Sequence, residues 1–128
     1  MRGFCYDNCM AFTHTDTELP IEGKYPKLIR DKIPELVESQ GKTASTRVLN
    51  DDEEYLKYLL AKLIEEATEL AHAETSHNQE EELADVYEVL NAVLEFLKLT
   101  QADIAIVQND KRQKRGGFKE RLLMLTKP

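Results

Sequence analysis

The chain has 128 residues, 41% of them hydrophobic and 32% charged, which suits one folded domain rather than two. Its formal net charge of −7 excludes nucleic acid as the main partner, because binding to a phosphate backbone needs a basic face. No apolar run approaches the ~20 residues of a membrane span and no secretory signal is visible, so we expect a cytoplasmic protein without membrane contact.

Residues 1–24 show no hydrophobic periodicity and contain scattered Thr and Asp. We expect a poorly ordered leader here, followed by a single domain over residues 25–128. Cys5 and Cys9 lie in the leader, and only His14 is near enough in sequence to join them in a zinc set. Two thiols with no further cysteines are therefore interpreted as incidental.

The next stretch predicts a short helix over residues 32–39. Asp31 is the expected N-cap, and Gly41 suits the position just after the last turn. Residues 42–49 are rich in Thr, Ser and Val, which favours an extended segment or a short strand.

Two long amphipathic helices are predicted next, over residues 51–74 and 79–99. Residues 75–78, Thr-Ser-His-Asn, are expected to break the chain between them, and so short a connection favours antiparallel neighbours. Thr100 then caps a third helix over residues 101–114. The expected fold class is all-α.

Each long helix carries two acids three residues apart: Glu66 and Glu69 in the first, Glu82 and Asp85 in the second. At ~100° per residue such pairs share one face. Glu66 lies on the shoulder of an apolar stripe and Glu82 lies inside one. The second stripe comprises Leu83, Val86, Leu90, Val93, Leu94 and Leu97.

A carboxylate beside apolar side chains has to be neutralised. Pairing with Lys or Arg, or protonation, would achieve this for one acid. Residues 51–85, however, hold twelve acids against two lysines, a local charge of −10. Because the hairpin would bring the four acids together, we expect a hard divalent cation that prefers oxygen ligands, Mg²⁺ or Mn²⁺.

The C-terminal stretch reverses this charge, with seven basic residues against two acids over residues 108–128. Lys111, Lys114 and Arg115 precede Gly116-Gly117, whose exposed N–H groups can approach an anion. The alternatives are a polyphosphate clamp and a solubilising helix end.

The two acidic stretches, Glu66-Ala67-Thr68-Glu69 and Glu82-Leu83-Ala84-Asp85, are twelve residues apart. They resemble the ExxE…ExxD signature of the MazG superfamily, all-α nucleoside triphosphate pyrophosphohydrolases related to dimeric dUTPases and phosphoribosyl-ATP pyrophosphohydrolases. Residues 27–34 and 114–118 resemble the flanking segments of a small MazG-like branch predicted to remove non-standard nucleotides.

The resemblance implies hydrolysis of (deoxy)nucleoside triphosphates to the monophosphate and pyrophosphate, with Mg²⁺. It makes Glu66, Glu69, Glu82 and Asp85 the metal ligands. It also implies a helical bundle completed by homo-oligomerisation, as a homodimer or homotetramer.

Each of the remaining candidate residues has more than one expected role. Glu65 would orient the attacking water or be simply solvated, and Lys62 would pair with Glu66 or reach a phosphate. Arg30 and Lys32 are second candidates for phosphate binding or ordinary solvated charges. The full set of expected phosphate-binding residues is Lys111, Lys114, Arg115, Arg30, Lys32 and Lys62. Asn91 would contact the base or sugar, as would Tyr87 if it does not pack in the core.

Three rivals stay open. The enzyme could act on phosphoribosyl-ATP or on dUTP alone. A ferritin-like metal protein would need an inward-facing Glu-x-x-His pair, which neither long helix offers. A helical dimerisation module without chemistry has no reason to place Glu82 in an apolar stripe.

Overall fold

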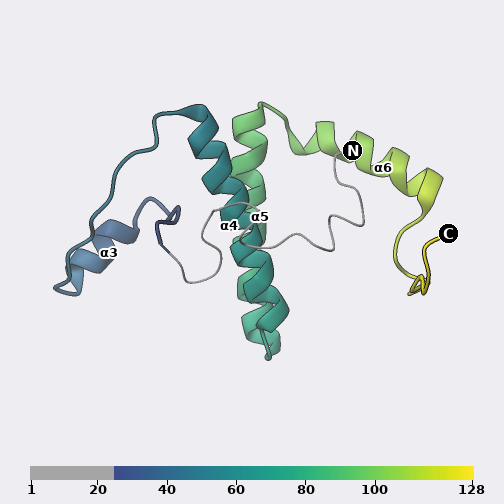
Figure 1. The fold of residues 1–128 in the computed structure, drawn as a ribbon, viewed down its shortest axis with the longest axis horizontal. Coiled ribbons are helices and arrows are strands. Elements are labelled where there is room, and N and C mark those ends of the chain that lie inside the picture. Colours follow the sequence, from purple (N-terminus) through teal and green to yellow (C-terminus); the bar gives the residue numbers. More distant parts are fainter. Residues whose placement is uncertain (1–24) are drawn as a thin grey trace. The chain divides into compact units, whose positions relative to one another are not determined.

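The computed structural model describes residues 25–128, and the regular structure in this range is entirely helical. Four helices follow one another: α3 (Ile33–Ser39), α4 (Asp52–His72), α5 (Ser76–Leu97) and α6 (Gln101–Arg115) (Figure 1). The all-α class is thereby confirmed for this part of the chain. The expectations for residues 1–24, with Cys5, Cys9 and His14, lie outside the described residues.

The caps of α4 and α6 follow from local sequence. The carboxylate of Asp51 accepts the N–H of Glu54 at 2.9 Å, and the first turn of α4 is acidic, which suits the positive end of the helix dipole. Thr100 and Asp103 form a reciprocal capping box at the start of α6. Gly116, at φ +81°, ends α6 in a conformation that glycine adopts without strain.

The start of α3 differs from the prediction. Lys32 occupies the N-cap position, and no side chain caps the helix there. Asp31 lies one residue too early, in a turn in which the Arg30 carbonyl accepts the N–H of Ile33 at 3.1 Å. The C-terminal end is as predicted, with Gly41 at φ +81°.

The connection between the long helices is shorter than expected. The Thr75 hydroxyl accepts the N–H of Asn78 at 3.1 Å, so Thr75 caps α5 instead of breaking the helix. His77 therefore lies in the first turn of α5, where it is exposed and pairs with Glu81 at 3.2 Å. Residues 42–49 form no strand in the described structure; they connect α3 to α4 without regular structure.

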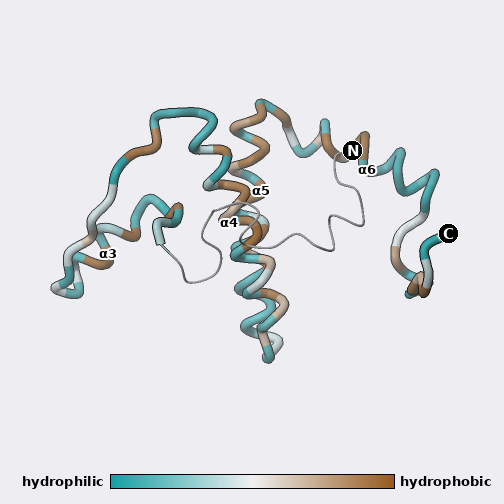
Figure 2. The backbone as a smooth tube through the Cα atoms, viewed as in Figure 1, coloured by the Kyte–Doolittle hydropathy of each residue, from teal (hydrophilic) through white to brown (hydrophobic). Residues whose placement is uncertain are grey.

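The chain divides into two compact units, the first ending at Val93 and the second covering residues 94–128. The first unit contains α3, α4 and most of α5, and the second contains α6. The second half of α6 is strongly hydrophilic (Figure 2). A single domain over residues 25–128 stays a prediction. Among the described helices, none combines the length and the apolar character that crossing a bilayer requires.

Helices α4 and α5 form an antiparallel hairpin joined by residues 73–75 (Figure 1). Its buried apolar residues are few: Leu59 and Ala61 on α4 and Val89 on α5. Much of the predicted stripe of α5 stays exposed, with Leu83 at 44% and Leu90 at 39%. These two residues stay exposed in the single chain because one partner helix covers only one side of each stripe.

Candidate metal centre on the helical hairpin

The hairpin gathers the acids of its two helices into one site, which we call the acidic cluster: Glu65, Glu66, Glu69, Glu82 and Asp85. One carboxylate oxygen each from Glu66, Glu82 and Asp85 lies within 4.8 Å of the others, and the same holds for Glu65, Glu66 and Glu69. Glu66 belongs to both groups and so occupies the centre. The short connection brings the end of α4 beside the start of α5, which is the juxtaposition that the spacing predicts.

Two of these acids are buried. Glu65 is 4% exposed and Glu66 is 5% exposed, although both are glutamates on a helix of a small domain. The alternative that Glu65 is solvated is therefore wrong. Burial of carboxylates at this level requires compensating charge or hydrogen bonds.

Glu82 lacks such compensation at one of its carboxylate oxygens. Its Oε1 atom is buried and has no hydrogen-bond partner among the residues that the structure describes. Glu82 lies two turns before Val89, the buried residue of α5, so both face α4. An uncompensated buried carboxylate oxygen is costly and marks a place where a cation or a donor would be stabilising.

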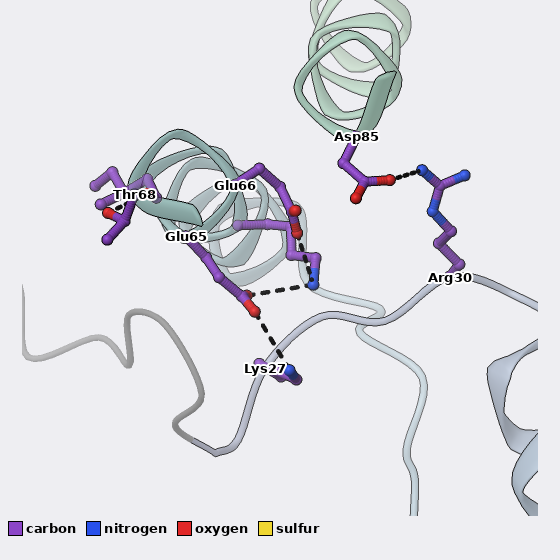
Figure 3. Close-up of polar contacts among 8 residues, drawn as sticks. Lys27, Arg30, Glu65, Glu66, Thr68 and Asp85 are labelled. Carbon is purple, nitrogen blue, oxygen red and sulfur yellow. Dashed lines mark hydrogen bonds and ion pairs between the residues drawn. The ribbon is translucent and has the colours of Figure 1, made fainter. Parts of the chain in front are cut away.

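Three basic side chains partly neutralise the cluster (Figure 3). Lys62, one turn earlier on α4, contacts Glu65 and Glu66 at 3.2 Å each. Lys27 donates to Glu65 at 3.3 Å. The two lysines come from different parts of the chain. Lys62 lies on α4 itself, whereas 38 residues separate Lys27 from Glu65.

The third base is Arg30, whose Nη2 donates to Asp85 Oδ1 at 2.6 Å. Lys27 and Arg30 both belong to residues 25–31, which we call the N-terminal strap. The strap runs past the open side of the hairpin and points these two side chains at acids on different helices (Figure 3).

The ion-pair alternative raised by the sequence is thus correct for Glu65, Glu66 and Asp85, but it does not complete the neutralisation. Five carboxylates face three basic groups, Lys27, Arg30 and Lys62, which leaves a formal charge of −2. That remainder equals the charge of one divalent cation.

The remaining charge affects the pKa values of the cluster. Burial, followed by the charges of Glu66 and Glu82, raises the pKa of Glu69 from 4.5 to about 7. Burial also raises the pKa of Glu66, against the opposing effect of Lys62. For Lys62 burial favours the neutral amine, but the two glutamates outweigh it and raise its pKa.

The donor set fits a hard divalent cation. All candidate ligand atoms are carboxylate oxygens, which Mg²⁺ and Mn²⁺ prefer, and the buried Glu82 Oε1 is available to bind an ion. Glu66, Glu82 and Asp85 form the group best suited to hold it, because it draws on both helices.

Two other predicted site residues, both in the first unit, do not join this cluster through any contact that the structure describes. Lys32 and Asn91 are exposed on the first unit. Lys111, Lys114 and Arg115 lie on α6 in the second unit, all exposed, and Lys114 pairs with Asp110 at 3.2 Å. Their role as a phosphate clamp stays a prediction. Tyr87 is 61% exposed, so the alternative that it packs in the core is wrong for the single chain.

Lys27 was not identified from the sequence as a site residue. The available signal was its position three residues before Arg30 in the same basic stretch. Nothing in the local pattern, however, shows that this stretch lies against α4, so the ion pair with Glu65 could be found only in three dimensions.

Comparison with known proteins adds little. No family model matches the chain, and no solved structure matches it. A protein of Mycolicibacterium smegmatis (strain ATCC 700084 / mc(2)155), described as uncharacterized, is 51% identical over 49 residues, which is 38% of this chain. The chain spans about half the length of that relative, since the match covers 49% of it. A match of this extent assigns no family.

Proposed function

We propose that this protein is a Mg²⁺-dependent nucleoside triphosphate pyrophosphohydrolase of the MazG-like type, which releases a nucleoside monophosphate and pyrophosphate. Removal of non-standard nucleotides is the role that its resemblance to the small MazG-like branch favours. The observation that carries the proposal is the convergence of Glu66, Glu82 and Asp85 within 4.8 Å, together with the unpartnered Oε1 of Glu82.

In this proposal Glu66, Glu82 and Asp85 would hold the ion. Glu69 would join them as the fourth ligand once its carboxyl group has lost its proton. When bound, Mg²⁺ neutralises triphosphate charge and lowers the pKa of water. Glu65, held by Lys27 and Lys62, keeps these two bases at the edge of the cluster. A free triphosphate is repelled by this acidic surface, so the metal is required for binding as well as for reaction.

Oligomerisation is part of the proposal. The apolar residues Leu83, Tyr87 and Leu90 recur at helical spacing on α5 and remain exposed. A second copy of the hairpin packed on this face would complete a four-helix bundle. Homodimers are therefore expected, and homotetramers would need a second interface besides this face.

The test is product analysis after incubation of the full chain with Mg²⁺ and a panel of nucleotides. The panel includes the standard deoxynucleotides, dUTP, oxidised nucleotides and phosphoribosyl-ATP. Monophosphate with pyrophosphate supports the proposal, and diphosphate with orthophosphate contradicts it. Activity confined to dUTP or to phosphoribosyl-ATP would select one of the rival enzymes. The absence of any hydrolysis would leave the helical dimerisation module as the better interpretation.

A further inference from the structure

A groove of about 620 Å³ lies in the first unit beside the acidic cluster. Four separate parts of the chain form it: the N-terminal strap, Pro34 on α3, residues 45–49, and the first turns of α4. Its volume is within the range of small-molecule sites, roughly 300–1,000 Å³. None of the roles derived above uses this groove.

The walls of the groove suit a flat, partly polar molecule. Three tyrosines line it, Tyr25 on the strap and Tyr55 and Tyr58 on α4, with apolar side chains such as Ile29 and Val48 between them. Aromatic side chains of this kind stack on nucleobases, because every base has a π face. The neighbouring Ser45 and Thr46 supply hydroxyl groups and backbone polar atoms at the same surface.

The charge of the groove is opposite to that of the protein. Lys27, Arg30 and Arg47 line it against one acid, Asp31, which gives +2 in a chain of −7. Arg47 is held at the entrance of α4 by a two-pronged contact with Glu54, at 2.6 and 3.3 Å. These three bases become available to an anionic ligand only by exchanging their carboxylate partners, Glu65, Asp85 and Glu54.

Two of these cations belong to both sites at once. Lys27 lines the groove and contacts Glu65 at 3.3 Å, and Arg30 lines the groove and contacts Asp85 at 2.6 Å. The spatial order is therefore aromatic groove, basic side chains, acidic cluster. A nucleoside triphosphate held by a metal has the same order, with base and sugar, then phosphates, then the cation.

We infer that the groove is the nucleoside subsite of the active centre, and that Lys27 and Arg30 bind the phosphate nearest the sugar. The inference rests on the proposed function for the identity of the reaction. It adds the location of the base and sugar and assigns the strap to substrate binding. Tyr58, fixed on α4, is the main stacking residue, while Tyr25 lines the groove from the strap, with the Lys27 ammonium 5.1 Å from the centre of its ring.

Asp85 now accepts the Arg30 guanidinium through Oδ1, so Arg30 would become available to a substrate phosphate if Asp85 held a cation instead.

The experiment compares substrate with inorganic tripolyphosphate, which has the phosphates but no nucleoside. Full-length wild type, Tyr58→Leu, Tyr58→Phe and Arg30→Gln are assayed for KM and kcat on the best nucleotide of the panel, and for inhibition by tripolyphosphate. Lys57→Gln, an exposed lysine of α4 outside the groove, is the control for loss of positive charge.

Tyr58→Leu is expected to raise KM about tenfold or more with kcat changed less than threefold, and to leave the inhibition constant of tripolyphosphate unchanged. Tyr58→Phe, which keeps the ring, stays within threefold of wild type. Arg30→Gln is expected to weaken the binding of substrate and of tripolyphosphate alike, and Lys57→Gln is expected to weaken the binding of neither. An unchanged KM in Tyr58→Leu overturns the inference, and so does an equal loss for both ligands, which indicates general damage.

The two proposals fail separately. Hydrolysis that does not depend on Tyr58 refutes the nucleoside subsite and leaves the proposed function intact. If wild type hydrolyses nothing, equilibrium dialysis of the same nucleotides against wild type and Tyr58→Leu decides on the groove. Binding that needs Tyr58 then supports the subsite without the reaction, and binding that does not need Tyr58 refutes it.

Discussion

Arg30 Nη2 lies 2.6 Å from Asp85 Oδ1, although 55 residues separate the two along the chain. The contact joins the N-terminal strap to α5, while Lys27 joins the same strap to α4 through Glu65. Since the two helices meet at the acidic cluster, the strap spans the site that they create.

Asp85→Asn is expected to lower kcat for pyrophosphate release at least 100-fold, because an amide supplies a weaker and uncharged metal ligand. The fold should tolerate the change. The pair with Arg30 is partly exposed, with side chains at 55% and 36%, and such pairs contribute about 0–1 kcal/mol. The measurements are steady-state kinetics and thermal unfolding. Asp110→Asn, an exposed acid on α6, is the matched control, and equal activity in both variants would contradict the assignment.

Glu82→Gln separates stability from metal binding. Without metal the variant should unfold at the same temperature as wild type or higher, because the change removes one of the negative charges around Glu69. With Mg²⁺ the wild type should instead unfold at the higher temperature, since a ligand at 100 times its Kd stabilises the wild-type fold by about 2.7 kcal/mol. Differential scanning calorimetry with and without Mg²⁺ tests this, and a Mg²⁺-induced shift equal in both proteins would refute a role for Glu82.

The raised pKa of Glu69 predicts a pH dependence of stability. Its pKa is 4.5 when unperturbed and about 7 in the fold, so the folded state binds the proton more tightly than the unfolded state. The stabilising contribution is complete below about pH 4.5 and is lost as the pH rises through 7. Metal-free protein should therefore lose stability between pH 5 and 8, roughly the span of this titration.

Glu69→Gln should flatten that part of the profile, because the amide does not titrate. Mg²⁺ binding should show the opposite trend in wild type and strengthen as the pH rises through 7, since the ion competes with the proton at Glu69. Urea unfolding and calorimetric titration over this range measure both effects. A wild-type profile identical to that of Glu69→Gln would show that Glu69 titrates normally.

Lys62→Met is expected to cost about 3 kcal/mol of unfolding free energy. Lys62 contacts two glutamates with side chains only 5% and 7% exposed, and removal of one partner from a buried ion pair leaves uncompensated charge. Addition of Mg²⁺ should restore part of the loss, because the ion replaces the missing positive charge. Lys57→Met, at an exposed position of the same helix, should change stability by about 0.5 kcal/mol or less. Comparable losses in the two variants would mean that the ion pairs of Lys62 with Glu65 and Glu66 contribute no more stability than an exposed lysine does.

Leu83→Glu is expected to convert a homodimer into a monomer in light scattering, because it places a charge in the exposed apolar face of α5. Leu36→Glu on α3, a leucine that is 54% exposed outside that face, should leave the mass unchanged. Wild type that is monomeric at high micromolar concentration would remove the oligomeric part of the proposed function. The acidic cluster, which one chain forms, would be unaffected.

The helices were largely predictable because their signals are local. Caps such as Asp51 and Thr100 act on the next three residues, and the apolar period of 3.6 needs no knowledge of the rest of the chain. The errors occurred where a residue could play two local roles. Thr75 was interpreted as a helix breaker and is a cap, and Asp31 was interpreted as a cap and lies in a turn.

The convergence of Glu66 with Glu82 and Asp85 was also predictable, because both pairs lie close to a short connection and need no distant segment to meet. The partners of the cluster were not. Lys27 and Arg30 reach Glu65 and Asp85 across 38 and 55 residues, and no local pattern encodes such contacts. The groove beside them likewise combines the strap, α3, residues 45–49 and α4.

The sequence by itself determined where α4 and α6 begin, which acids share a face, and that the hairpin would carry excess negative charge, since caps, periodicity and charge are properties of neighbouring residues. Only the tertiary structure decided which bases neutralise those acids, that Glu65 is buried, and that the pKa of Glu69 is raised to about 7. Desolvation and ion pairing depend on what packs against a side chain, and here the N-terminal strap and the opposing helix supply that environment.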